Sequence, residues 1–125
     1  MLTTKFENNY AYYEIKDFYL KITCKKAKYI DYRAARVLVS DRLRIQSYKA
    51  YHIICDISLI EGISLDARDY LATSGSLLIK SAALVSTRST LKHFATYFIA
   101  INNPKAPTKV FDSIQDAEQY IQSQL

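Results

Sequence analysis

Residues 51–58 read Tyr51-His-Ile-Ile-Cys-Asp-Ile-Ser58, and Leu59-Ile-Glu-Gly-Ile-Ser64 follows without a gap. The first run is continuously apolar from Ile53 to Cys55, which is typical of a strand buried on both faces. Gly62 indicates a turn, and Ser64 belongs to the residue types that cap helix N-termini. The stretch therefore predicts a strand, a turn and a helix. In α/β domains, functional sites usually lie at the ends of such strands.

Upstream of this stretch, residues 6–15 and 18–24 predict an antiparallel hairpin. In the second run Leu20, Ile22 and Cys24 alternate with polar residues, as expected for a strand with one buried face. Asp31 is a good N-cap, and a helix is expected from there to about Ser47. Its buried stripe is predicted to contain Tyr32, Ala35, Val39 and Leu43.

Downstream, Ser64 begins a helix that ends near Gly75, and residues 76–80 are expected to add a helical turn. A strand at 82–85, a helix at 89–102, a strand at 109–111 and a helix capped by Ser113 follow. The helix at 89–102 has the clearest apolar period, with Leu91, Phe94, Ala95, Phe98 and Ile99.

The order β-β-α-β-α-β-α-β-α predicts an α/β fold. We expect a mostly parallel sheet of five to six strands with helices and an N-terminal antiparallel hairpin. The 125 residues should form a single domain, residues 1–125.

Composition restricts the classes of function. No apolar run reaches the roughly 18 residues of a membrane span, and MLTTKFENN lacks the apolar core of a signal peptide. We therefore expect a cytoplasmic protein. The net charge of +5 is spread along the chain, which favours a solvated surface over nucleic-acid binding. Cys24 and Cys55 lie in apolar runs without CxxC spacing and are expected to be buried free thiols. No metal site and no cofactor are predicted.

The stretch Asp56-Ile-Ser-Leu-Ile-Glu-Gly-Ile-Ser-Leu-Asp-Ala-Arg68 resembles the core of STAS domains, the anti-sigma-factor antagonist family. That core reads roughly D-L-S-x-V-x-x-I-D-S-S-G-L, and the matching positions are Asp56, Ser58, Ile60 and Ile63. Leu65 stands where the family has its phosphorylatable serine, Ser64 where it has Asp, and Ala67 where it has Gly. The resemblance therefore implies the fold but not the phosphoserine switch.

The C-terminal half is similar to uncharacterised bacterial STAS-like proteins, and the likeness covers roughly residues 50–122. Their pattern is a strand, a Ser/Arg turn, an aromatic helix, a Pro-containing loop, a short strand and a final helix. The corresponding residues here are Ala83–Ser86, Arg88, Phe94 to Phe98, Asn103-Pro-Lys-Ala-Pro107, Val110-Phe111-Asp112 and Ala117.

A regulatory or protein-interaction module is the leading interpretation. Its site is expected at the carboxyl ends of the parallel strands, with Ser58, Ser64 and Arg88. The Ser64 hydroxyl, the helix N-terminal amides and Arg88 would suit a small anion or nucleotide. Caps and turn residues without a ligand are an equally good interpretation.

Two further classes of function remain open. Catalysis is disfavoured because no P-loop, GxSxG or GxGxxG motif occurs, and the histidines have no evident nucleophile. His52 begins a strand, at the opposite end of the sheet from Ser58 and Ser64, and His93 should lie on a helix exterior. A structural homodimer is the other alternative, with Tyr10, Tyr12 and Tyr13 of the hairpin at the interface. The expected partner is a protein, either an unknown one or a second copy.

Overall fold

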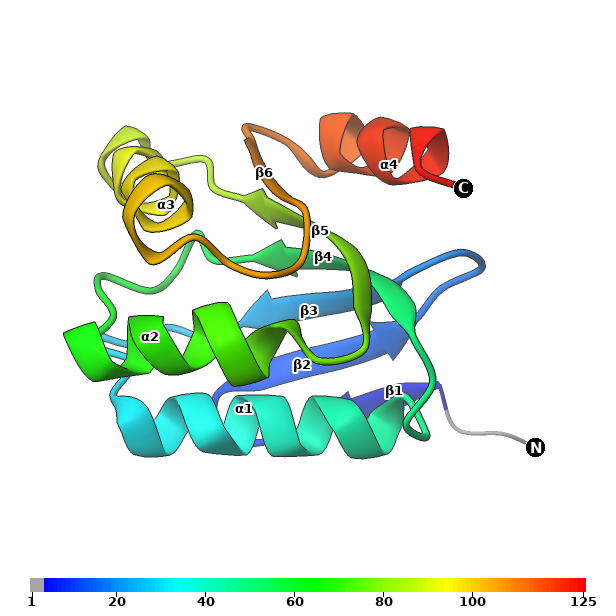
Figure 1. Cartoon of the computed structure of the whole chain (residues 1–125), viewed down its shortest axis with the longest axis horizontal. Coiled ribbons are helices and arrows are strands. Elements are labelled where there is room, and N and C mark those ends of the chain that lie inside the picture. Colours follow the sequence, from blue (N-terminus) through cyan, green and yellow to red (C-terminus); the bar gives the residue numbers. More distant parts are fainter. Residues whose placement is uncertain (1–3) are drawn as a thin grey trace.

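A computed structural model of the chain describes residues 4–125, with the side chains of residues 90, 91 and 94 outside the description. The predicted α/β fold is confirmed (Figure 1). Its centre is a six-stranded sheet whose strands lie side by side in chain order. These are β1 (Lys5–Glu7), β2 (Ala11–Ile15), β3 (Leu20–Cys24), β4 (Tyr51–Asp56), β5 (Ile79–Val85) and β6 (Thr108–Phe111).

The sheet is antiparallel from β1 to β3 and parallel from β3 to β6. Each parallel step passes through a helix, namely α1 (Tyr32–Ile45), α2 (Leu65–Thr73) or α3 (Ser89–Asn102). Right-handed crossovers that all advance in the same direction place their helices on the same face. The last helix, α4 (Ile114–Ser123), packs on the opposite face.

The core has one layer on each face of the sheet. On the face of α1–α3, four alanines let the helices approach the strands closely: Ala34, Ala35, Ala67 and Ala95. On the other face Ala117 and Ile121 of α4 pack against Ile54. Ile53 is 2% exposed and Ile54 is 0% exposed, so β4 is buried on both faces as the sequence predicts.

The three N-caps predicted from the sequence are confirmed. The side chain of Asp31 accepts a hydrogen bond of 2.8 Å from Ala34 N, that of Ser64 accepts from Ala67 N at 3.3 Å, and that of Ser113 accepts from Asp116 N at 3.1 Å. Each such cap stabilises its helix by about 1 kcal/mol. These local bonds fix where α1, α2 and α4 begin.

The structure differs from the sequence prediction in two places. Residues 6–15 form two short strands instead of one, because the Asn8 side chain accepts hydrogen bonds from Tyr10 N and Ala11 N and closes a turn. Between α2 and β5, a 3-10 turn, η1 (Ser74–Ser76), replaces the helical turn expected at 76–80. Leu78 has a φ of 58°, which ends helical structure there, and β5 already begins at Ile79. In α3 the predicted residues Leu91 and Phe94 lie outside the described side chains.

The tyrosines of the hairpin are not a single surface. Tyr12 is 52% exposed, but Tyr13 is only 1% exposed and belongs to the core. The Tyr13 hydroxyl donates to Leu38 O at 3.0 Å and accepts from Asn8 Nδ2 at 3.2 Å. Tyr10 is half-buried and packs against the core. Tyr13 is therefore not available to a partner, and the predicted interface of Tyr10, Tyr12 and Tyr13 does not exist as one exposed patch.

None of the helices among residues 4–125 is both long enough and apolar enough to cross a lipid bilayer.

Candidate functional site

The loops that leave β3 and β4 are tied to each other beyond the sheet. Ala27 bridges to Ile60 and Ile30 to Ile63, both in parallel. Three backbone hydrogen bonds of 2.9 Å hold the loops together: Glu61 N to Ala27 O, Ile30 N to Gly62 O, and Ser64 N to Ile30 O. Ile30 and Ile60 are buried below them. We call residues 25–31, 56–66 and 86–88 the rim.

Two of the predicted site residues meet in the rim. Arg88 Nη1 donates to Ser58 O at 3.3 Å and to Ile60 O at 3.5 Å. The Ser58 hydroxyl accepts from Thr87 N at 3.2 Å, and Ser58 N donates to Asp56 Oδ1 at 2.9 Å. Although thirty residues separate them in the chain, Ser58 and Arg88 thus join the ends of β4 and β5.

Ser64, the third predicted residue, acts as a cap. Its hydroxyl donates to Asp66 Oδ1 at 2.6 Å while accepting from Ala67 N. The described contacts of Ser64 include none with Ser58 or Arg88. Asp66 Oδ1 also accepts from Ala67 N at 2.9 Å, so a carboxylate of the chain itself stands at the N-terminus of α2. This geometry disfavours a second anion at that point, because two negative charges would lie side by side.

The rim also presents three large apolar side chains that sequence reasoning did not assign to a site. Tyr29 is 61% exposed, Leu59 54% and Leu65 65%. Tyr29 lies against Gly62, where an added Cβ would come within 3.1 Å of the ring. The sequence feature that could have indicated them is the occurrence of large apolar residues next to charged residues in predicted loop and cap positions. Leu65, at the position of the STAS phosphoserine, is the most exposed of the three.

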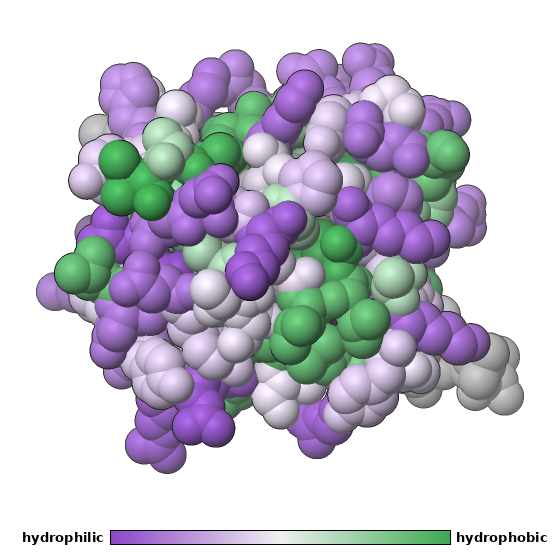
Figure 2. Space-filling model, viewed as in Figure 1, coloured by the Kyte–Doolittle hydropathy of each residue, from purple (hydrophilic) through white to green (hydrophobic). Residues whose placement is uncertain are grey.

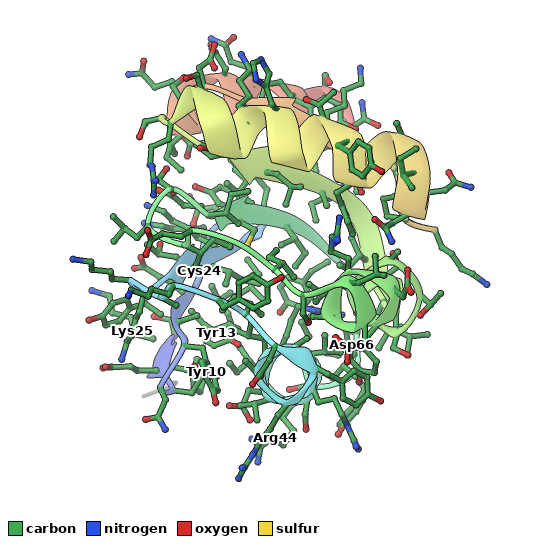
Figure 3. The ribbon with its side chains drawn as sticks, turned by 90° about the vertical axis from the view of Figure 1, so that its left-hand side faces the viewer. Tyr10, Tyr13, Cys24, Lys25, Arg44 and Asp66 are labelled. Atoms are coloured by element: carbon green, nitrogen blue, oxygen red, sulfur yellow. The ribbon has the colours of Figure 1, made fainter. Side chains whose placement is uncertain are left out.

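The rim carries exposed charges of both signs. Lys26, Lys28 and Arg88 are exposed, and so are Asp31, Glu61 and Asp66. Figure 3 shows Lys25 at the outer surface, and its ammonium pairs with Glu7 and lies 4.7 Å from the centre of the Tyr12 ring.

Below the rim, a cavity of about 160 Å³ lies between the sheet and α1–α3. Cys24 and Cys55 contribute to its wall, with their sulfur atoms 4.0 Å apart. Both are free thiols, as predicted, but only Cys24 is fully buried, whereas Cys55 is half-buried. The hydrogen bond with Cys24 and burial raise the pKa of Cys55, so its thiol stays protonated at neutral pH. Figure 3 shows Cys24 directed into the molecule, whereas Lys25 points outward.

Arg42 is a buried residue that the predicted helix stripe did not contain. It is 3% exposed, whereas Tyr32 of the predicted stripe is 41% exposed. Arg42 Nη1 donates to Gln46 Oε1 at 2.5 Å. Nη2 donates to Gly75 O at 3.1 Å and Leu77 O at 3.0 Å. Burial lowers its pKa to about 10. The guanidinium therefore stays charged at neutral pH and holds the end of the α2–η1 segment against α1.

His52 lies near the start of β4, where the sequence places it, and contacts a serine. His52 Nδ1 and Ser81 Oγ are 2.7 Å apart. A Ser–His contact is one part of a hydrolytic site, but Ser81 is only 1% exposed and cannot meet a substrate from solution. Burial, followed by the nearby charge of Lys80, lowers the pKa of His52. Among the described residues, no three or more His, Cys, Asp and Glu side chains form a group suited to a metal ion.

Comparison with known proteins gives the family. The model of the family described as "Domain of unknown function (DUF7793)" matches residues 13–125. The chain belongs to this family. The comparison with curated proteins gives no match for this DUF7793 chain.

A solved structure shares the fold of the DUF7793 chain. It is the crystal structure of an uncharacterized protein of the DUF3478 family, with a SpoIIAA-like fold, from Shewanella loihica PV-4. It is 17% identical, with a TM-score of 0.62, and the match covers 92% of this chain and 97% of the other. The STAS-like fold expected from Asp56–Arg68 is thereby confirmed, and the likeness supports the fold alone.

Proposed function

We propose that this DUF7793 domain is a protein-interaction module that binds its partner through the rim. The observation that carries the proposal is the exposure of Tyr29 and Leu59 on loops that are joined by backbone hydrogen bonds, and of Leu65 at the first residue of α2. Leucine and tyrosine side chains are more often buried in a folded domain, so three of them held outward on one rim suit a docking surface.

The rigidity of the rim favours binding. The loops after β3 and β4 are joined by backbone hydrogen bonds, and Arg88 ties the loop after β4 to the end of β5. A surface that is already ordered loses little conformational entropy when a partner docks. The exposed apolar side chains lie on a rim with equal numbers of exposed basic and acidic residues, which suits a partner with an apolar patch bordered by charges of both signs.

The resemblance to STAS domains supports the same surface. Position 65 corresponds to the phosphorylatable serine of that family, and here it is a leucine with 65% exposure. A leucine cannot be phosphorylated, so binding through this rim would not be switched at position 65.

The test is a pull-down from the native cell with the full chain as bait. Leu59→Glu and Leu65→Glu should each abolish capture of a partner that the wild type retains, because a charge would enter the apolar centre. The control is Leu77→Glu, since Leu77 is 56% exposed at the turn between α2 and β5. Figure 2 shows a large apolar area at this turn, which makes it the rival surface on that side of the molecule. Loss of the partner with Leu77→Glu, and not with the rim variants, would refute the proposal.

Anion or nucleotide binding is the second candidate, supported by the proximity of Arg88 to Ser58. A thermal-shift titration with inorganic phosphate and with a nucleotide separates the two functions. Protection of the wild type, lost in Arg88→Ala, would favour this candidate. Absence of protection by either ligand would remove it and leave the interaction surface unaffected.

A further inference from the structure

The edge strand β1 directs its unpaired backbone groups outward at two residues. Thr4 O accepts from Ile15 N at 2.9 Å, and Asn8 N donates to Ala11 O at 3.0 Å. Backbone groups alternate in direction along a strand, so Thr4, Phe6 and Asn8 face β2. Lys5 and Glu7 therefore direct their N–H and C=O groups away from the sheet, at its edge (Figure 1).

We propose that β1 pairs antiparallel with β1 of a second copy of this chain, with the two-fold axis at Phe6. In this register Lys5 lies opposite the partner's Glu7, and Glu7 opposite the partner's Lys5. The outward backbone groups belong to the same two residues, so each Lys–Glu pair is also a hydrogen-bonded pair of the new ladder. The order Lys5-Phe6-Glu7 is thus complementary to itself when reversed.

A groove beside β1 supports the same pairing. It has a volume of about 710 Å³ and lies between the β1–β2 hairpin and the end of α1. Its apolar lining includes Phe6, Ile15, Ile45 and Tyr51. Phe6 is only half-buried in the single chain. Cα atoms in a non-hydrogen-bonded antiparallel pair are about 4.5 Å apart, so the partner's Phe6 would lie next to Phe6 on the side of the groove and cover apolar surface.

The opposite edge of the sheet does not offer this complementarity. In β6, Ala82 N donates to Pro107 O and Ser86 N to Phe111 O, so Thr108 and Val110 carry the outward groups. Self-pairing through those two residues would be centred on Lys109 and would place it opposite the partner's Lys109. Like charges directly opposite destabilise a strand pair. The charge pattern therefore selects β1 and not β6.

The pairing has a geometric consequence for the rim. An antiparallel two-fold reverses the direction of the strands between the copies. The carboxyl ends of β3–β6 would then point in opposite directions in the two copies. The dimer would carry two rims at opposite ends of one continuous sheet and would be bivalent.

The experiment measures the mass of the full chain in solution by light scattering and sedimentation over a concentration series. The wild type should reach twice the chain mass of 14.4 kDa. Lys5→Glu and Glu7→Lys should each weaken the dimer about 10-fold, because two opposite-charge pairs become like-charge pairs. The double variant Lys5→Glu/Glu7→Lys should restore it, and raising the salt concentration should weaken the wild-type dimer.

Two control variants test whether the pairing depends on the β1 edge itself. Glu14 lies 3.9 Å from Lys5 within the same chain, so Glu14→Gln removes that contact and should leave the dimer intact. Lys109→Glu changes the other edge and should also leave it intact. A wild type that stays at the chain mass at every concentration would overturn the proposal. A dimer that is insensitive to Lys5→Glu and to salt, or a double variant that does not recover, would overturn it as well.

Discussion

Arg42 Nη2, in the last turn of α1, donates a hydrogen bond of 3.1 Å to the carbonyl oxygen of Gly75, which follows α2. This contact joins two helical segments through a buried charge and gives the Gly75 carbonyl a donor. Because Arg42 is 3% exposed, water could replace the hydrogen bonds that it donates only if the core rearranged.

The first prediction concerns this contact. Arg42→Met keeps much of the side-chain volume but removes the donor to the buried Gln46 Oε1 and to the partly buried carbonyl oxygens of Gly75 and Leu77. Each buried unsatisfied group costs about 1–3 kcal/mol, so the free energy of unfolding should fall by about 2–4 kcal/mol. Urea denaturation measures it. Arg33→Met, at an exposed position of the same helix, should change it by less than about 0.5 kcal/mol. Equal effects of the two variants would contradict a role for Arg42 in holding α2.

The second prediction separates the adjacent tyrosines of β2. Tyr13→Phe removes the hydroxyl that donates to Leu38 O, and it should lower the free energy of unfolding by about 1 kcal/mol. Tyr12→Phe, at a position that is 52% exposed, should have little effect. Thermal and urea unfolding of both variants provide the comparison. A larger loss for Tyr12→Phe would be inconsistent with the observed strand register.

The third prediction is a pH dependence. Burial and Lys80 lower the pKa of His52 in the folded chain below the unfolded value of 6.5. Below pH 6.5 the unfolded chain therefore binds the proton more readily, and stability should be lost as the pH falls from 6.5 towards the folded pKa. Urea unfolding at pH 7.5, 6.5 and 5.5 measures it. His52→Gln should reduce this loss of stability at low pH. His93→Gln, at an exposed position, should leave the loss unchanged. The opposite result would contradict the assignment of the loss to His52.

The fourth prediction concerns the thiols. The raised pKa of Cys55 and the burial of Cys24 should make both thiols react slowly with an aromatic disulfide reagent at pH 8 in the folded chain. In concentrated urea both should react rapidly. Labelling followed by absorbance gives the two rates. Rapid reaction of either thiol without denaturant would show that the cavity wall opens more easily than the structure implies.

The sequence determined the parts of the fold that depend on neighbours in the chain. Asp31, Ser64 and Ser113 could be identified as caps because each bonds an amide three residues away. The buried strand at Ile53 and Ile54 followed from its continuous apolar run. The order of strands and helices then limited the sheet to a mostly parallel one, since crossovers have a fixed hand.

For the candidate site, the sequence placed Ser58, Ser64 and Arg88 at the carboxyl ends of the parallel strands, and the structure has them after β4 and β5. Only the tertiary structure decided that Ser58 and Arg88 touch and that Ser64 serves its own helix. A contact across thirty residues depends on the register of β4 against β5, which no local pattern encodes.

The tertiary structure alone also decided which side chains are buried where the pattern is ambiguous. Tyr12 and Tyr13 are the same residue type, so only pairing with β3 and the position of α1 place one outside and the other in the core. Arg42 reads as a surface residue in sequence, and it is buried because the α2–η1 carbonyls converge on it. Local hydrogen bonds and the spacing of apolar residues can be predicted from the sequence. The burial of a polar group depends on partners that come close only in the folded chain.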